Sequence, residues 1–164
     1  MCSAQIFVQC TLSILIFEGV FHDFLIGPKL ALCWVIENGK KTVLLVDDYR
    51  SLREGILLLL EDDYRIVAVE TGEQAMEVVS ALGPDLIVLD LKLPGISGVE
   101  VLSEMRSRKI DSPVLIISAI QDPSVAAHLY RMGACDYLTK PFGIHELRGK
   151  MEQILRGRSQ AQCG

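Results

Sequence analysis

The sequence predicts an α/β protein whose core is one five-stranded parallel sheet with helices on both faces. Short runs of Val, Ile and Leu without polar alternation lie within 42–46, 86–90 and 114–117, and such runs are typical of strands that are buried on both faces. Two further short strands are indicated at 65–69 and 135–138. Each run is followed by apolar residues at helical spacing. Successive strand–helix units form a parallel sheet through right-handed crossovers. At about 150 residues per domain, 164 residues suit a single domain.

Each predicted element has its own boundary signals. The predicted strands are Thr42–Val46, Arg65–Val69, Leu86–Asp90, Val114–Ile117 (ending on Ser118) and Cys135–Leu138. Helices are indicated by Leu52, Ile56, Leu59 and Leu60, then Ala75, Val78, Val79 and Leu82, then Gly98, Val101, Leu102 and Met105, then Val125, Leu129 and Met132, and finally Leu147, Met151, Ile154 and Leu155. Gly83-Pro84 predicts a helix end, Asp122-Pro123 a capped start, and Gly157 the end of the last helix.

The composition argues against a nucleic-acid surface. The net charge is −5 and the isoelectric point is near 5.2, and no run of basic residues is present to bind phosphates. The cysteines, Cys2, Cys10, Cys33, Cys135 and Cys163, are scattered without a CxxC pair. We interpret them as core or tail thiols of a reducing, cytoplasmic compartment and not as a disulfide framework or a zinc site.

Residues 1–39 differ from the rest of the chain. Apolar runs at 4–17 and 24–36 are interrupted by polar residues, and neither reaches the roughly 20 apolar residues of a membrane span. The first basic residue is Lys29, so no secretory signal is indicated. Three interpretations stay open: a partner- or membrane-surface segment, a weak signal anchor, or a misassigned start codon. We favour the last, with translation beginning near Val35, and an intact mass matching all 164 residues would contradict it.

Charged and hydroxyl side chains come directly after the predicted strands. Asp47 and Asp48 follow the first strand, Asp90 ends the third, Ser118 the fourth, and Lys140 comes just after the fifth. The carboxyl ends of parallel strands meet at one edge of the sheet, where ligands bind. Three carboxylates gathered there would repel one another, so a divalent cation is expected. Oxygen ligands alone suit Mg²⁺ and a phosphoryl group, which an aspartate can accept as a nucleophile.

The ordered motifs VDD, LDLKLPGISG, IISA and DYLTKPF resemble the receiver domain of two-component response regulators. The resemblance covers residues 40–156, which makes 1–39 an N-terminal extension and 157–164 a polar tail. It implies a flavodoxin-like, doubly wound sheet of order 2-1-3-4-5 with five helices. It also implies a cis peptide bond between Lys140 and Pro141.

The resemblance assigns a role to each matching residue. It implies that Asp90 is the phosphoacceptor and that Lys140 pairs with the phosphate. Asp47, Asp48 and Asp90, with the main-chain carbonyl of Lys92, would bind Mg²⁺, and Ser118 and Tyr137 would form a switch pair. Tyr49 departs from the family pattern, which often has another acid there. Ile120 is at a variable position beside the attacking water, and we hypothesise that it slows loss of the phosphoryl group.

The resemblance also implies a signalling role. The donor would be a sensor histidine kinase or a histidine phosphotransfer protein, and the domain would catalyse its own phosphorylation and slow dephosphorylation without an external small-molecule substrate. Phosphorylation would reshape the face formed by the fourth helix, fifth strand and fifth helix. The output would pass to an unidentified protein target, as in stand-alone receivers, and a homodimer through that face stays open.

Three other functions would also use an α/β fold of this kind. A haloacid-dehalogenase-type phosphatase needs a second Asp two residues after the first, where this chain has Lys92 after Asp90 and Tyr49 after Asp47. A flavodoxin-like cofactor binder needs a phosphate loop rich in Gly and hydroxyl groups, which Asp48-Tyr49-Arg50 is not. A binding module of the same fold that acts without phosphorylation is the alternative that the sequence does not exclude.

Overall fold

A computed structural model describes residues 39–161 of the chain. The strands are β1 (Thr42–Val46), β2 (Arg65–Val69), β3 (Leu86–Asp90), β4 (Val114–Ser118) and β5 (Asp136–Thr139). The helices are α3 (Arg50–Leu60), α4 (Gly72–Leu82), α5 (Gly98–Ser107), α6 (Pro123–Arg131) and α7 (Ile144–Ala161). Strands and helices alternate throughout, as the sequence predicts.

The strands form one parallel sheet of order β2-β1-β3-β4-β5. This is the predicted doubly wound topology. The register aligns Val46 at the end of β1 with Leu89 of β3, and Ser118 at the end of β4 with Thr139 of β5. The residues that follow these strands therefore emerge at the same edge.

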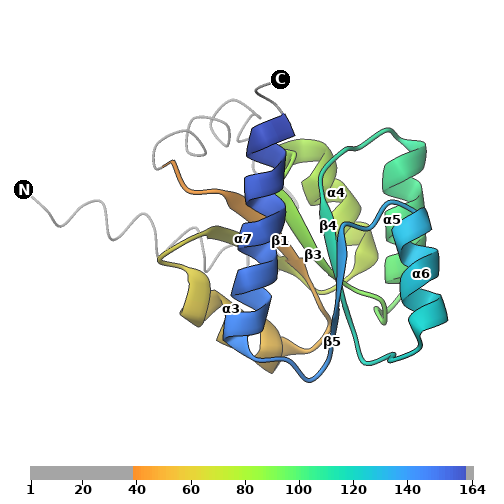
Figure 1. Ribbon diagram of the computed structural model, residues 1–164, viewed down its shortest axis with the longest axis horizontal. Helices are drawn as coiled ribbons and strands as arrows, with labels where there is room; N and C mark the ends of the chain where they lie inside the picture. Colours follow the sequence, from red (N-terminus) through yellow and green to blue (C-terminus); the bar gives the residue numbers. More distant parts are fainter. Residues whose placement is uncertain (1–38, 162–164) are drawn as a thin grey trace, which may run out of the picture. The chain divides into compact units, whose positions relative to one another are not determined.

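Helices cover both faces of the sheet, as Figure 1 shows. Alternate residues of each strand point to opposite faces, so Leu44 and Val46 pack with α4, α5 and α6, whereas Val43 and Leu45 pack with α3 and α7. All five residues of β1, β3 and β4 are buried. Burial on both faces explains why these strands show no polar alternation.

Three helices begin at side-chain caps. The Thr71 hydroxyl accepts the Gln74 N–H before α4, and Ser97 with Glu100 forms a capping box before α5. The predicted cap at α6 is confirmed, because the Asp122 side chain accepts the Ser124 N–H and Pro123 is the first helical residue. These caps fix the ends of the loops that leave the carboxyl edge.

Some predicted details differ from the structure. Leu59 lies in α3, as its spacing predicts, but its side chain is exposed, because it lies about 100° around the helix from the buried Leu60. Strand β5 is shifted by one residue, and α7 continues through Gly157 to Ala161. A helix tolerates an interior glycine at a cost of about 1 kcal/mol, so Gly157 is not a stop by itself. Cys135 is an exposed free thiol and not a core or tail residue.

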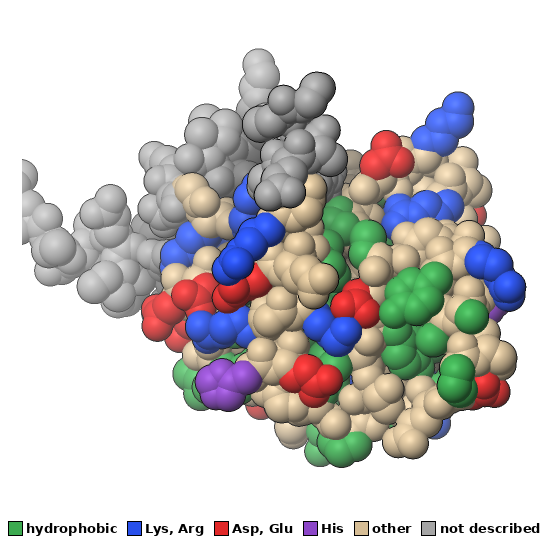
Figure 2. All heavy atoms as spheres, in the orientation of Figure 1, with side chains coloured by type: hydrophobic (Ala, Val, Ile, Leu, Met, Phe, Trp, Pro, Cys, Tyr) green, Lys and Arg blue, Asp and Glu red, His purple; other side chains and the backbone are tan. Residues whose placement is uncertain are grey.

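Other predictions are confirmed or lie outside the described residues. The Lys140–Pro141 bond is cis, as the resemblance implies. The predictions on residues 1–38 and on the other four cysteines fall on residues that the structure does not describe. Among the helices of residues 39–161, none combines the length and the apolarity that crossing a membrane requires. On the face drawn in Figure 2, basic and acidic side chains are interspersed.

Candidate functional site

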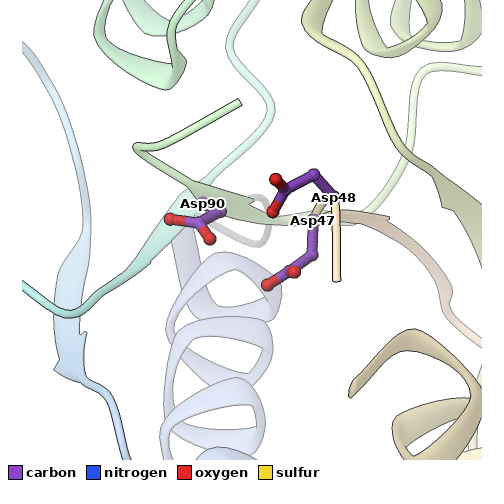
Figure 3. A group of neighbouring side chains, drawn as sticks. All are labelled: Asp47, Asp48 and Asp90. Carbon is purple, nitrogen blue, oxygen red and sulfur yellow. The ribbon is translucent and has the colours of Figure 1, made fainter. Parts of the chain in front are cut away.

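Three carboxylates meet at the carboxyl edge of the sheet. Asp47 and Asp48 follow β1, and Asp90 ends the neighbouring strand β3. One oxygen from each lies within 4.8 Å of the others, and Figure 3 shows the three side chains around a common space. Asp47 and Asp90 are buried, whereas Asp48 is exposed. The predicted acidic cluster is therefore a cluster in space.

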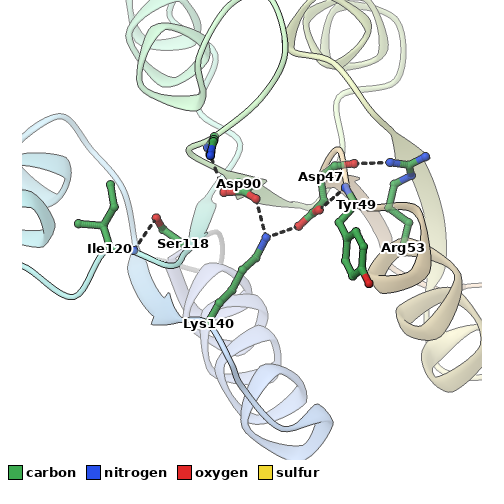
Figure 4. A network of polar contacts seen from close by, with 8 residues as sticks. Asp47, Tyr49, Arg53, Asp90, Ser118, Ile120 and Lys140 are labelled. Atoms are coloured by element: carbon green, nitrogen blue, oxygen red, sulfur yellow. Dashed lines mark hydrogen bonds and ion pairs between the residues drawn. The ribbon is translucent and has the colours of Figure 1, made fainter.

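Lys140 lies between the two buried carboxylates. Its ammonium donates to Asp47 Oδ2 at 2.6 Å and to Asp90 Oδ2 at 2.5 Å (Figure 4). The backbone N–H of Lys140 donates to the Ser118 carbonyl at 2.7 Å, which continues the pairing of β5 with β4 beyond the last strand residue. The loop after β5 thus places an ammonium group in contact with the ends of β1 and β3.

The charges of this site shift two pKa values. Burial raises the pKa of Asp47, against the opposing hydrogen bonds from Lys140 and Tyr49. Burial acts to lower the pKa of Lys140, but the hydrogen bonds and negative charges of Asp47 and Asp90 outweigh it and raise that pKa. Lys140 therefore remains an ammonium, and three carboxylates around one ammonium leave the site with excess negative charge.

The donor set fits a small divalent cation. Its ligand atoms are carboxylate oxygens from Asp47, Asp48 and Asp90, and no nitrogen or sulfur ligand belongs to this cluster. Hard oxygen donors of this kind suit Mg²⁺, which accepts a few carboxylates and retains several water ligands. A cation would also offset the carboxylate repulsion that Lys140 offsets only in part.

The backbone beside each buried carboxylate folds back onto it. The Tyr49 N–H donates to Asp47 Oδ1 at 2.8 Å, and the Lys92 N–H donates to Asp90 Oδ1 at 3.0 Å. Both contacts join residues two apart, which is the Asx-turn pattern. Within the described residues, no buried side-chain nitrogen or oxygen lacks a hydrogen-bond partner. The orientations of these two carboxylates are therefore fixed on both sides.

Ser118 and Tyr137 meet at the loop between β4 and α6. The buried Ser118 hydroxyl accepts the Ile120 N–H at 3.2 Å, and the half-buried Tyr137 hydroxyl donates to the Ile120 carbonyl at 2.6 Å. The two residues that the sequence analysis pairs thus hold the same backbone residue from opposite sides. The Ile120 side chain itself is exposed.

Sequence reasoning missed two charged residues at this edge. Arg53 donates to the Asp47 carbonyl, and Glu73 accepts the Ile96 N–H in the loop after β3. Glu73 has a lowered pKa, because its own backbone N–H and that of Ile96 donate to the carboxylate. The only sequence signal for these two residues is that each is a charged residue near the start of a helix, Arg53 in α3 and Glu73 in α4. That position alone also suits a solvated surface residue.

The comparisons with known proteins agree with this geometry. The family model described as "Response regulator receiver domain" matches residues 43–152. Response regulator MprA of Mycolicibacterium vanbaalenii is 35% identical over 115 residues, which cover 70% of this chain and 50% of that protein. Transcriptional regulatory protein CiaR of Streptococcus pneumoniae is 37% identical over 114 residues, with 70% and 51% covered.

A solved structure supports the same assignment. The receiver domain of Francisella response regulator 1452 is 28% identical, with a TM-score of 0.69, and the match covers 72% of this chain and 98% of that one. The chain spans about half the length of the curated relatives it matches. The match with the family model and these relatives confirm the resemblance seen in the motifs. The chain belongs to the response regulator receiver domain family of two-component signalling.

Proposed function

We propose that this protein accepts a phosphoryl group on Asp90 from a phosphohistidine of a sensor histidine kinase or a histidine phosphotransfer protein. The observation that supports this most directly is the contact of the Lys140 ammonium with Asp90 inside the acidic cluster. An ammonium there is in place to neutralise charge on the oxygens of a transferring phosphoryl group. Cytoplasmic location is part of the proposal.

Mg²⁺ is the proposed cofactor. Asp47, Asp48 and Asp90 would hold it, with the main-chain carbonyl of Lys92 as a further ligand. When bound, Mg²⁺ supplies positive charge that lets a carboxylate approach a negatively charged phosphoryl donor. The protein's own contribution is to fix the carboxylates, through the backbone hydrogen bonds to Asp47 and Asp90.

The chemical step is an in-line displacement at phosphorus. An Asp90 carboxylate oxygen attacks, a new P–O bond forms an acyl phosphate, and the P–N bond to the donor imidazole breaks. The imidazole leaves with the electron pair of that bond and takes a proton. Because the Lys92 N–H and Lys140 each bind one oxygen of Asp90, the attacking carboxylate is oriented before the donor arrives.

The response to phosphorylation would begin at Ser118. Its hydroxyl would leave the Ile120 N–H and donate to a phosphoryl oxygen, and Tyr137 would follow into the vacated space. Both residues now contact Ile120, so a movement of this loop would affect both. The face formed by α6, β5 and α7 would then change shape and signal to a protein target, or to a second copy of the chain.

Labelling tests the proposal. Incubated with acetyl phosphate and Mg²⁺, the wild-type protein should gain one phosphoryl group by mass, and Asp90→Asn should abolish the gain. Asp111→Asn removes an exposed carboxylate elsewhere and should leave labelling unchanged. Absence of labelling with any donor would contradict the proposal and favour a binding module that acts without phosphorylation.

A further inference from the structure

Arg53 is a nearly buried cation beside the acidic cluster. Its side chain is 12% exposed, although it lies on α3 near the protein surface. Its Nη1 donates to the Asp47 carbonyl at 2.6 Å, and its Nη2 donates to Glu70 Oε2 at 3.3 Å (Figure 4 for the first contact). Withdrawing a guanidinium from water is costly unless its donors are bonded, so these two contacts account for its placement.

The first contact acts on the peptide that joins Asp47 to Asp48. The Asp47 N–H donates to the Val69 carbonyl of β2 at 3.2 Å, and the Asp47 carboxylate accepts the Tyr49 N–H. Arg53 binds the remaining polar group of this residue, its carbonyl oxygen. The rotation of the Asp47–Asp48 peptide is therefore fixed, and with it the direction in which the exposed Asp48 side chain leaves the chain.

The second contact connects Arg53 to two further elements. Glu70 directly follows β2, and its N–H donates to the Gln74 side chain of α4 at 3.1 Å. The guanidinium is thus bonded to the residues that follow β1 and β2, and Glu70 is in turn bonded to the start of α4. Its planar fork makes the two bonds in different directions, which a single ammonium does poorly.

We propose that Arg53 is a positioning residue for the divalent cation. By holding the Asp47 carbonyl, it keeps the carboxylates of Asp47 and Asp48 directed at the same space as Asp90. The proposal rests on the proposed function, because that function requires Mg²⁺ at this cluster. Outer contacts that orient metal ligands typically change metal affinity by about 10- to 100-fold when they are removed.

The direction in which Mg²⁺ affinity changes when Arg53 is replaced distinguishes a positioning role from a simple charge effect. A guanidinium near a cation site repels the cation, so charge alone predicts that neutralising Arg53 strengthens Mg²⁺ binding. Positioning predicts weaker binding. Arg50 offers a matched control on the same helix, because it bonds Glu54 and its side chain is 65% exposed.

The experiment measures Mg²⁺ affinity from the rise of the unfolding temperature with Mg²⁺ concentration, relative to the same variant in EDTA. Arg53→Gln should bind Mg²⁺ about tenfold more weakly than wild type, while Arg50→Gln should bind equally or slightly more tightly. Because each variant is compared with its own metal-free state, a general loss of stability does not imitate the result. If Arg53→Gln does not fold, Arg53→Lys replaces it. Lysine keeps the positive charge, so weaker Mg²⁺ binding by Arg53→Lys would support the positioning role.

The outcomes also separate this inference from the proposed function. If wild type responds to Mg²⁺ and the Arg53 variant binds as tightly as Arg50→Gln, the positioning role is wrong and the phosphoacceptor proposal is unaffected. If wild type shows neither a response to Mg²⁺ nor labelling of Asp90, the proposed function fails and this inference fails with it.

Discussion

At the scale of single residues, Lys140 supplies the positive charge that stabilises the two buried carboxylates when no metal is bound. Lys140→Met keeps the length of the side chain but leaves Asp47 and Asp90 without their shared cation. We expect the free energy of unfolding in EDTA to fall by about 1–3 kcal/mol, because two buried carboxylates lose a donor and repel each other. Urea unfolding measures the change.

A double variant tests that reason. Asp47→Asn in the Lys140→Met background removes one of the two repelling charges and should recover most of the lost stability. Addition of Mg²⁺ to Lys140→Met alone should also recover stability, because the cation replaces the missing positive charge. An equal loss in the single and the double variant would mean that packing, and not charge, explains the role of Lys140.

Ile120 offers a second prediction at this scale. Its backbone contacts both Ser118 and Tyr137, but its side chain is exposed beside the site. Ile120→Ala keeps the backbone contacts and removes apolar cover from the proposed phosphoryl group, so the phosphorylated half-life should shorten severalfold. Leu58→Ala removes a more exposed apolar side chain on α3, 72% exposed against 45% for Ile120, and should leave the half-life unchanged. An unchanged or longer half-life in Ile120→Ala would reject the hypothesis.

At the scale of elements, the start of α5 must approach β3 closely. A Cβ on Gly98 would lie 2.1 Å from the Asp90 carbonyl and 2.8 Å from the Leu91 Cα, both of them backbone atoms that cannot rotate away. Gly98→Ala should therefore destabilise the protein by about 1–3 kcal/mol and weaken Mg²⁺ binding by displacing Asp90. Gly149→Ala on α7, with open space around the new methyl group, should instead stabilise by about 0.5–1 kcal/mol. Thermal unfolding compares the pair.

A comparison of the predicted with the observed strands and helices shows which parts of the fold the sequence predicts. Strands β1 and β3 lie where the apolar runs place them, because burial on both faces leaves a direct signal in the sequence. The half-buried edge strand β2 also has its predicted bounds. The predicted helix end at Gly157 is wrong, because glycine content is a local signal, whereas helix continuation depends on neighbouring elements. Arg53 was missed for the same reason, since its partners Asp47 and Glu70 lie on other elements.

At the scale of the whole molecule, parallel topology gathers charge at one edge. The chain has a net charge of −5, and three of its carboxylates meet at the ends of two adjacent strands. The same carboxylates that suit a cation raise the free energy of the metal-free fold. Predicting this edge required only strand order and direction, so the cluster could be inferred before the structure, whereas its contacts with Arg53 and Ile120 could not.

The whole molecule should lose stability in acid through carboxylates outside the cluster of Asp47, Asp48 and Asp90. The Ser97 side chain and N–H lower the pKa of Glu100, and the Ser124 side chain and N–H lower that of Asp122. Burial acts to raise the pKa of Asp136, but hydrogen bonds from Lys150 and the Tyr137 N–H lower it overall. A carboxyl group whose pKa is lower in the folded state stabilises the fold above its ordinary pKa and loses that contribution as pH falls.

The ordinary values, 4.5 for glutamate and 3.8 for aspartate, place the loss below about pH 4.5. Asp47 has a raised pKa and acts in the opposite direction, since its protonation on acidification relieves buried charge. Urea unfolding from pH 7 to pH 3 should therefore show a steep fall below pH 4.5, and the fall should be shallower in Glu100→Gln and steeper in Asp47→Asn. A wild-type stability that rises down to pH 3 would mean that relief of the acidic edge outweighs the loss of the three other carboxylate contacts.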